Sequence, residues 1–208
     1  MPTVLSLLAH PDDAEFLCAG ALIRLKREHG FAVHIASMTP GDCGSVEHSA
    51  DAISRIRRAE GAAAASVIGG TYHCLDERDL LIVYGEKTLE KVTRLMREVR
   101  PDIVLTHSPA DYMLDHEMTS TITRAAAFAA PIPNFLCERS VGPVLAGIPH
   151  LYYCDPVELK DLMGRDVTPG FLVDVSGVID VKANMLAAHA SQRDWLRKHG
   201  QSVHRIVA

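Results

Sequence analysis

The stretch TVLSLLAHPDDAEF (residues 3–16) sets an apolar run directly against a histidine and three carboxylates. Residues 3–9 are typical of a short buried strand, and a strongly apolar helical stretch follows near residues 15–29. Carboxylates are costly to desolvate unless something pairs with them. The polar residues between the strand and the helix therefore either face bulk water or surround a cation.

Apolar strand-like segments and helical segments alternate along the first 130 residues. Further strands are expected at 31–38, 71–75 and 102–107, and helices at about 50–67, 89–99 and 117–129. Ser49 is positioned to cap the second helix at its N-terminus, and Gly30 to end the first. This alternation predicts an α/β fold, a three-layer Rossmann-like domain with a mostly parallel sheet covered by helices on both faces.

The pattern loosens after residue 130, where Pro/Gly-rich connections separate the apolar segments. Residues 150–154 and 171–175 are expected to add strands, and a final helix is expected over about 177–198, capped by Ser176. We therefore expect one domain over residues 1–208, with a core at 1–130 and a C-terminal extension of sheet and helix at 131–208.

Charge and composition exclude several classes of protein. The net charge of −5 argues against a nucleic-acid partner, because phosphate binding needs a concentrated basic face. No apolar run approaches the roughly 20 residues that cross a bilayer, and the first residues lack the basic start of a signal peptide. The five cysteines are odd in number and form no CxxC pair, which indicates reduced thiols and a cytoplasmic location.

Two polar loops are predicted to meet at one edge of the sheet. In a doubly wound sheet of order 3-2-1-4, the first and fourth strands are neighbours, and ligands bind beyond their carboxyl ends. The loops after these strands carry His10, Asp12, Asp13 and Glu15, and His107, Asp111, Asp115 and His116. A mixed set of histidines and carboxylates suits zinc, and a carboxylate left over could act as general base.

Other interpretations of the same loops are weaker or less specific. Neither GxGxxG nor GxxxxGK[ST] is present in the first loop, so a nucleotide site is not indicated. The alternative to a metal site is a solvated polar loop, in which His10 caps the following helix and the dipole of that helix favours Asp12 and Asp13.

Four segments together resemble the LmbE/PIG-L family of zinc-dependent N-deacetylases. They are AHPDDAE (9–15), TPGDCGS (39–45), RRAEGAAAASVIG (57–69) and PDIVLTHSPADYMLDHEMTS (101–120). The resemblance covers about residues 3–124, with a weaker similarity in MLAAHASQ (185–192).

The resemblance implies a site and a reaction. His10, Asp13 and His116 would bind one Zn²⁺, although other divalent ions are possible, and Asp12 would take a proton from the zinc-bound water that attacks an N-acetyl amide. The implied substrate is a small N-acetylated amino sugar or sugar conjugate, and the implied assembly is a homo-oligomer. Arg57 falls where the family carries an arginine facing the mouth of the active site, and Asp79 matches a family carboxylate, although Leu80 replaces the glycine that follows it. Both are candidate substrate contacts, and the alternative is an ion pair that holds a loop to a helix.

One position departs from the family pattern. Members often read HPDH where this chain reads MLDH, so Met113 replaces a histidine. A thioether cannot donate a proton to an oxyanion or a leaving group. The role could pass to His107, His189 or Tyr112, or zinc could suffice.

The sequence is also compatible with two other functions. The chain could hydrolyse another small N-acyl amine, because Met113 leaves the substrate uncertain. It could also be a metal-binding module that has lost catalysis, although the presence of Asp12, which the implied zinc ligands do not include, counts against this.

Overall fold

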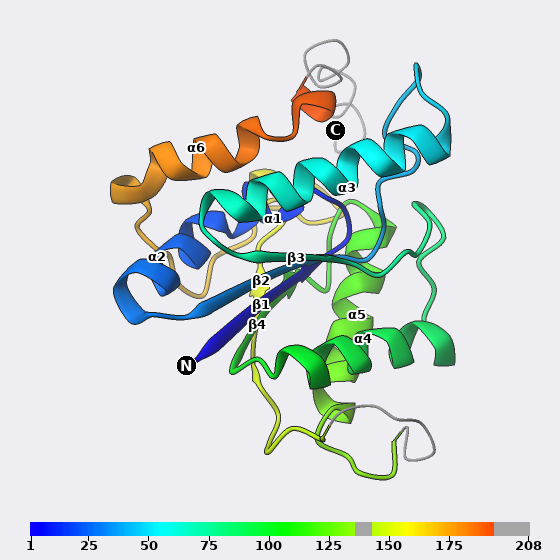
Figure 1. The fold of residues 1–208 in the computed structure, drawn as a ribbon, viewed down its shortest axis with the longest axis vertical. Coiled ribbons are helices and arrows are strands. Elements are labelled where there is room, and N and C mark those ends of the chain that lie inside the picture. The colour runs from blue at the N-terminus through cyan, green and yellow to red at the C-terminus, as the bar shows by residue number, and fades with distance from the viewer. Residues whose placement is uncertain (136–142, 194–208) are drawn as a thin grey trace.

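The structure is a computed structural model that describes residues 1–135 and 143–193. Its sheet has five strands in the order β3-β2-β1-β4-β5, and every pairing is parallel. The strands are β1 (Thr3–Leu8), β2 (Ala32–Ser37), β3 (Thr71–Cys74), β4 (Ile103–His107) and β5 (His150–Cys154). The predicted neighbours β1 and β4 lie side by side at the centre (Figure 1).

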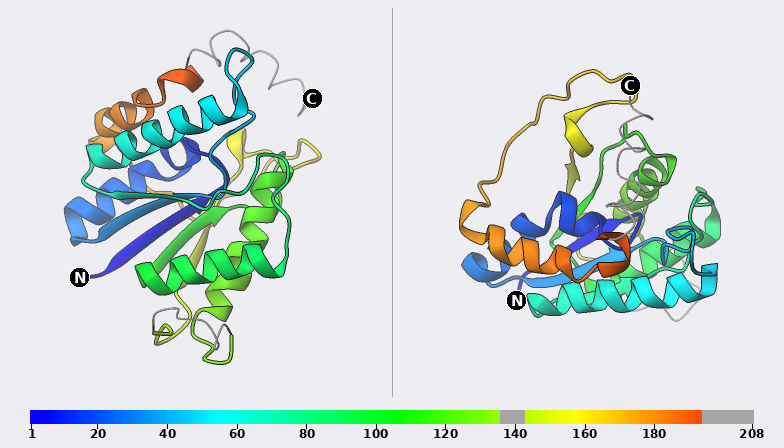
Figure 2. Two further views of the ribbon diagram at one scale, coloured as in Figure 1. Left: turned by 45° about the vertical axis from the view of Figure 1, so that its right-hand side comes forward. Right: turned by 90° about the horizontal axis from the view of Figure 1, so that it is seen from above.

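Helices cover both faces of this sheet, which confirms the three-layer α/β prediction. The helices are α1 (Asp13–Leu17), α2 (Ala19–His29), α3 (Ala50–Val67), α4 (Glu86–Val99), α5 (Leu114–Ala129) and α6 (Ile179–Ala187). Figures 1 and 2 show α1, α2, α3 and α6 on one face and α4 and α5 on the other. None of the described helices is long and apolar enough to cross a membrane.

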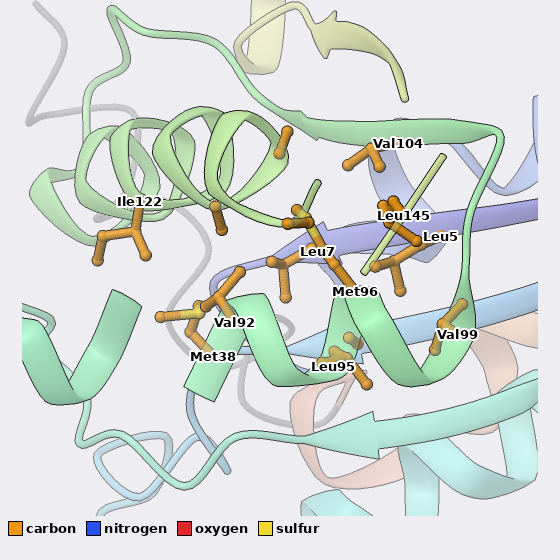
Figure 3. Packing of buried hydrophobic residues seen from close by; sticks show 14 of the residues in the cluster. Leu5, Leu7, Met38, Val92, Leu95, Met96, Val99, Val104, Ile122 and Leu145 are labelled. Carbon is orange, nitrogen blue, oxygen red and sulfur yellow. The ribbon is translucent and has the colours of Figure 1, made fainter. Parts of the chain in front are cut away.

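The central strand β1 anchors two hydrophobic clusters, one on each face. Leu5 and Leu7 belong to the cluster beneath α4 and α5 (Figure 3), and Val4 and Leu8 belong to the cluster beneath α2, α3 and α6. This alternation follows from the two-residue repeat of a strand. Each fully buried leucine or valine contributes about 1.5–3 kcal/mol, so β1 fixes the loop that follows it firmly in place.

The helix expected over residues 15–29 is interrupted. It forms two helices, α1 and α2, separated by Cys18 at φ −135° and ψ 0°. The apolar pattern continues through the break, and no proline marks it. The expected caps are confirmed, since Gly30 ends α2 at φ 69° and Ser49 Oγ accepts the N–H of Ala52 at the start of α3.

The strand predicted at 171–175 was wrong. That segment is irregular and runs over α2, where Arg24 Nη1 donates to the carbonyl of Asp174 at 3.0 Å. Val175 lies so close that a Cβ on Gly20 would be 2.3 Å from its Cγ1. The bond from Arg24 and the contact with Gly20 therefore hold this segment, and it pairs with no strand of the described sheet.

The final helix begins later than expected. A 3₁₀ turn occupies Ser176–Val178, and α6 starts at Ile179 without a side-chain cap. Ser176 uses its N–H to bond Asp174 Oδ1 at 2.9 Å rather than capping the helix with its hydroxyl. The helix ends at Ala187, before the expected end near residue 198, and residues 194–198 lie outside the described residues.

Candidate active site

The loop after β1 turns sharply at Asp12. This residue has φ 116° and ψ −23°, a conformation that costs a residue with a Cβ about 1–3 kcal/mol. The turn sends neighbouring carboxylates in different directions. Asp13 Oδ2 accepts the N–H of His10 at 2.7 Å, whereas Asp12 Oδ1 accepts a hydrogen bond from Arg57 Nη2 at 2.9 Å.

His10, Asp13 and His116 meet as a candidate metal centre. One donor atom from each lies within 4.8 Å of the other two, and Asp13 Oδ2 is 3.3 Å from His10 Nδ1 and 3.7 Å from His116 Nε2. His116 lies in the first turn of α5, and it reaches the β1 loop because β1 and β4 are neighbours. Two imidazoles and one carboxylate are a donor set that zinc accepts, with a fourth position open.

A second carboxylate stands behind each histidine of this group. Asp111 Oδ1 lies 3.0 Å from His116 Nδ1, and Asp115 Oδ2 lies 3.2 Å from His10 Nε2. Each histidine can donate one N–H to its carboxylate and keep the other nitrogen, the one facing Asp13, as a lone-pair donor. Sequence reasoning placed Asp111 in the loop without assigning it a partner, and the structure pairs it with His116.

A second possible ligand group consists of His107, Asp111 and His116. His107 Nε2 accepts the N–H of Ala9 at 2.9 Å and also lies 3.2 Å from Asp13 Oδ2. Its ring is stacked on His116 with centroids 3.8 Å apart, and it is 0% exposed. His107 therefore supports the cluster from behind, and the group with His10 and Asp13 is the better candidate.

The charges around His10 favour a cation at this point. Burial by itself lowers the pKa of His10, but the hydrogen bonds to Asp115 and Asp13 and the charge of Asp79 outweigh it and raise the pKa to about 10. Burial would raise the pKa of Asp13, yet the surrounding histidines hold it well below its usual value. The same negative field that retains a proton on His10 would attract a divalent ion in place of that proton.

Asp12 lies beside the candidate ligands without belonging to their group. Burial raises its pKa to about 6, although the Arg57 guanidinium opposes this shift. Asp12 also lines a pocket of about 490 Å³. The other lining residues come from α1 and from α6 and the segment after it: Phe16, Ala183, Leu186, Ala187, His189, Gln192 and Arg193. A buried carboxylate at a pocket wall can accept a proton from a reacting group.

The two expected substrate contacts, Arg57 and Asp79, have different surroundings. Arg57 is 4% exposed, and its ion pair with Asp12 is the alternative expected from the sequence. Arg57 also donates to the carbonyls of Pro11 at 2.7 Å and Gly41 at 3.4 Å. Asp79 Oδ2 accepts the N–H of Cys43 at 2.8 Å. Asp79 Oδ1 is buried, lies 4.0 Å from His10 Nε2, and has no hydrogen-bond partner among the described residues.

The fold and this cluster together define a class of protein: an α/β domain with a histidine–carboxylate centre at the carboxyl edge of a parallel sheet, suited to activating water. The family model for GlcNAc-PI de-N-acetylase (PIG-L) matches residues 5–127, which is more than half of the chain. The chain belongs to this family.

Relatives with known activities include deacetylases and one hydratase. The chain is 27% identical to the 1D-myo-inositol 2-acetamido-2-deoxy-alpha-D-glucopyranoside deacetylase of Rhodococcus erythropolis, over 88% of this chain and 79% of the relative. It is 28% identical to the diacetylchitobiose deacetylase of Thermococcus kodakarensis, over 91% and 69%. It is also 26% identical to the 4-oxalmesaconate hydratase of Pseudomonas putida, over 92% and 75%.

The chain shares its fold with the solved structure of a deacetylase. The N,N'-diacetylchitobiose deacetylase of Pyrococcus horikoshii superimposes with a TM-score of 0.80 at 23% identity, covering 98% of this chain and 76% of that one. This likeness supports the LmbE-like architecture expected from the sequence.

Proposed function

We propose that this protein is a zinc-dependent hydrolase that removes the N-acetyl group from an N-acetylated amino sugar or sugar conjugate. The observation that carries this proposal is the convergence of His10, Asp13 and His116, with the carboxylate of Asp12 left outside the group and beside a pocket. Family membership and the two deacetylase relatives support the same reaction class.

The donor set fits a divalent ion of the zinc type. His10, Asp13 and His116 would hold it, and Asp115 and Asp111 would orient the two imidazoles. A bound zinc would polarise the amide carbonyl and lower the pKa of water. An O-only cation such as Mg²⁺ fits less well, because two of the three donors are imidazole nitrogens.

Asp12 is the proposed general base. Its carboxylate would take a proton from the water that attacks the amide carbonyl, and the ion pair with Arg57 would hold its orientation. Asp12 Oδ1 is turned to Arg57, and Asp12 lines a pocket, so this carboxylate is not used as a member of the ligand group. The presence of Asp12 in this position argues against an inactive metal-binding module.

Arg57 and Asp79 are the proposed residues of the substrate region. Asp79 is suited to direct contact, because its buried Oδ1 could accept a hydrogen bond from a sugar hydroxyl. Arg57 already bonds three protein oxygens, so its contribution would pass mainly through Asp12.

Hydration of a carbon–carbon double bond is the second candidate function, because one relative is a hydratase at similar identity. Hydrolysis of another N-acyl amine is a third. Release of acetate separates them. We expect the zinc-loaded protein to release acetate from at least one of N-acetylglucosamine, N-acetylglucosaminyl-inositol and N,N'-diacetylchitobiose. Absence of acetate from all three, together with hydration of 4-oxalmesaconate, would overturn the proposal.

A cytoplasmic location and a homo-oligomeric assembly stay predictions. In support of assembly, several large apolar side chains of β5 and the segment after it are exposed: Tyr152, Tyr153, Leu162, Met163, Phe171 and Leu172. Clusters of exposed apolar side chains often mark contacts between proteins. Light scattering of the purified chain would give the number of subunits.

A further inference from the structure

A buried acid and a buried histidine lie together next to the candidate site. Glu15 on α1 and His189, just after α6, are each 1% exposed, and Glu15 Oε2 lies 3.3 Å from His189 Nε2. These residues are far apart in the sequence and are brought together because α1 and α6 share one face of the sheet. Buried ion pairs are weak evidence for stability, since apolar residues often serve as well. Stability alone therefore does not explain this pair.

Both side chains keep unused hydrogen-bonding capacity. Both ring nitrogens of His189 and Glu15 Oε1 are buried and make no hydrogen bond within the described part of the chain, although His189 Nε2 lies within ion-pair distance of Glu15 Oε2. Leaving such a group unpaired costs about 1–3 kcal/mol. His189 also lines the pocket that Asp12 lines, so a molecule in that pocket could satisfy the imidazole.

The surroundings of His189 favour its protonated form. Burial lowers its pKa, but the nearby carboxylate of Glu15 outweighs burial, and Asp12 and Glu60 add to the effect, so the pKa is raised. Glu60 belongs to α3 and binds the N–H and hydroxyl of Ser191, which anchors the segment after α6. Arg193 also lines the pocket and carries a positive charge.

We propose that His189, held by Glu15, donates the proton to the departing amine when the amide bond breaks. This inference rests on the proposed function. Asp12 takes one proton from the attacking water, and the new C–O bond forms. The C–N bond then breaks with its electron pair on nitrogen, and that nitrogen takes the proton of His189. The proton on Asp12 returns His189 to its charged form, so that amide and water give carboxylic acid and amine.

The other candidates for this role are less suited. His107 Nε2 already contacts the N–H of Ala9 and Asp13 Oδ2, its ring is stacked on His116, and the residues that line the pocket do not include it. Met113 has no acidic proton. His189 combines a carboxylate partner, an unpaired ring nitrogen and a place in the pocket wall.

The test compares two substrates that differ in their need for a proton. N,N'-diacetylchitobiose releases an amine, which must be protonated, whereas p-nitrophenyl acetate releases a phenolate, which leaves without a proton. For zinc-loaded His189→Gln we expect kcat on the amide to fall by about 10²–10³-fold, in the range of general acid catalysis. We expect ester hydrolysis to stay within about threefold of the wild type, with zinc content unchanged.

Ser191→Ala is the matched structural control. It loosens the same segment by removing the hydroxyl that binds Glu60, and it should change the amide and ester rates by the same factor. Equal losses on both substrates in His189→Gln, or no loss on the amide, would overturn the proposal. Wild-type protein that hydrolyses the ester but no N-acetyl amide would instead overturn the proposed function.

Glu15→Gln provides a second readout if His189→Gln fails to fold. His189 then loses the negative charge that raises its pKa. The alkaline limb of the kcat profile for the amide should move to lower pH, while the ester profile keeps its alkaline limb. An alkaline limb that does not move would assign the proton to another group.

Discussion

Arg57, which is buried, and Asp12, which is partly buried, form an ion pair in which Nη2 lies 2.9 Å from Oδ1. The pair joins the middle of α3 to the strained turn after β1, and the same guanidinium binds the carbonyl of Pro11. An arginine here therefore holds both the backbone and the carboxylate of the loop. We expect this pair to be coupled in stability as well as in position.

Removal of Arg57 alone should destabilise the protein strongly. In Arg57→Met, Asp12 becomes an unpaired, partly buried carboxylate, and we expect a loss of about 3–5 kcal/mol in the free energy of unfolding. Adding Asp12→Asn should recover part of that loss, which a double-mutant cycle by urea denaturation would measure. Arg165→Met is the control, because the side chain of Arg165 is 75% exposed in its pair with Asp161 and its removal should cost about 0–1 kcal/mol. Additive effects of the two changes would show that the pair is not coupled.

Asp12→Asn should separate metal binding from catalysis. The substitution keeps size and removes the base, so we expect kcat for acetate release to fall by about 10²–10⁴-fold. Bound zinc, measured by mass spectrometry of the metal, should stay near the wild-type ratio because Asp12 points to Arg57. Loss of zinc together with activity would place Asp12 among the ligands.

The carboxylates behind the histidines should tune metal affinity. Asp111→Asn and Asp115→Asn each weaken the partner of one imidazole, and we expect zinc affinity to fall by about 10–100-fold in competition with a chelator. Asp161→Asn, in an exposed turn with Arg165, is a matched control that should leave the affinity unchanged. Unchanged affinity in both test variants would indicate that the ion is held elsewhere.

Local patterns in the sequence predicted the strands of the first 130 residues, and a doubly wound order of 3-2-1-4, assumed for them, brought the two polar loops together; the structure has this order. Each strand of the first 130 residues is a short apolar run bounded by turn formers, and parallel connections leave few topologies. The break at Cys18 and the path of residues 171–175 were missed, because both depend on contacts between distant segments. Val175 against Gly20 and Arg24 on Asp174 have no signature in the local sequence.

In the candidate site, too, the sequence predicted which residues take part but not which side chains contact each other. Residue types and loop positions pointed to two polar loops, and the resemblance to the family singled out His10, Asp13 and His116, which the structure brings together. Partner assignments were beyond the sequence: Asp115 precedes His116 in the chain, yet its carboxylate lies against His10. A residue adjacent in sequence need not face its neighbour at the start of a helix, where successive side chains point about 100° apart.

Two neighbouring histidines on strands β2 and β3 should make the free energy of unfolding depend on pH. His34 Nδ1 on β2 and His73 Nε2 on β3 are 2.9 Å apart, so one ring must donate and the other accept. Burial lowers the pKa of both, and the neighbouring His34 lowers that of His73 further. The folded protein then binds fewer protons than the unfolded chain, so the stabilising contribution is complete above the unfolded pKa of about 6.5 and declines as pH falls below it.

We expect the free energy of unfolding of His34→Gln/His73→Gln to vary less between pH 7 and pH 5 than that of the wild type, whereas exposed His29→Gln should follow the wild-type curve. Parallel curves for the double variant and the wild type would show that protonation of this pair does not oppose folding.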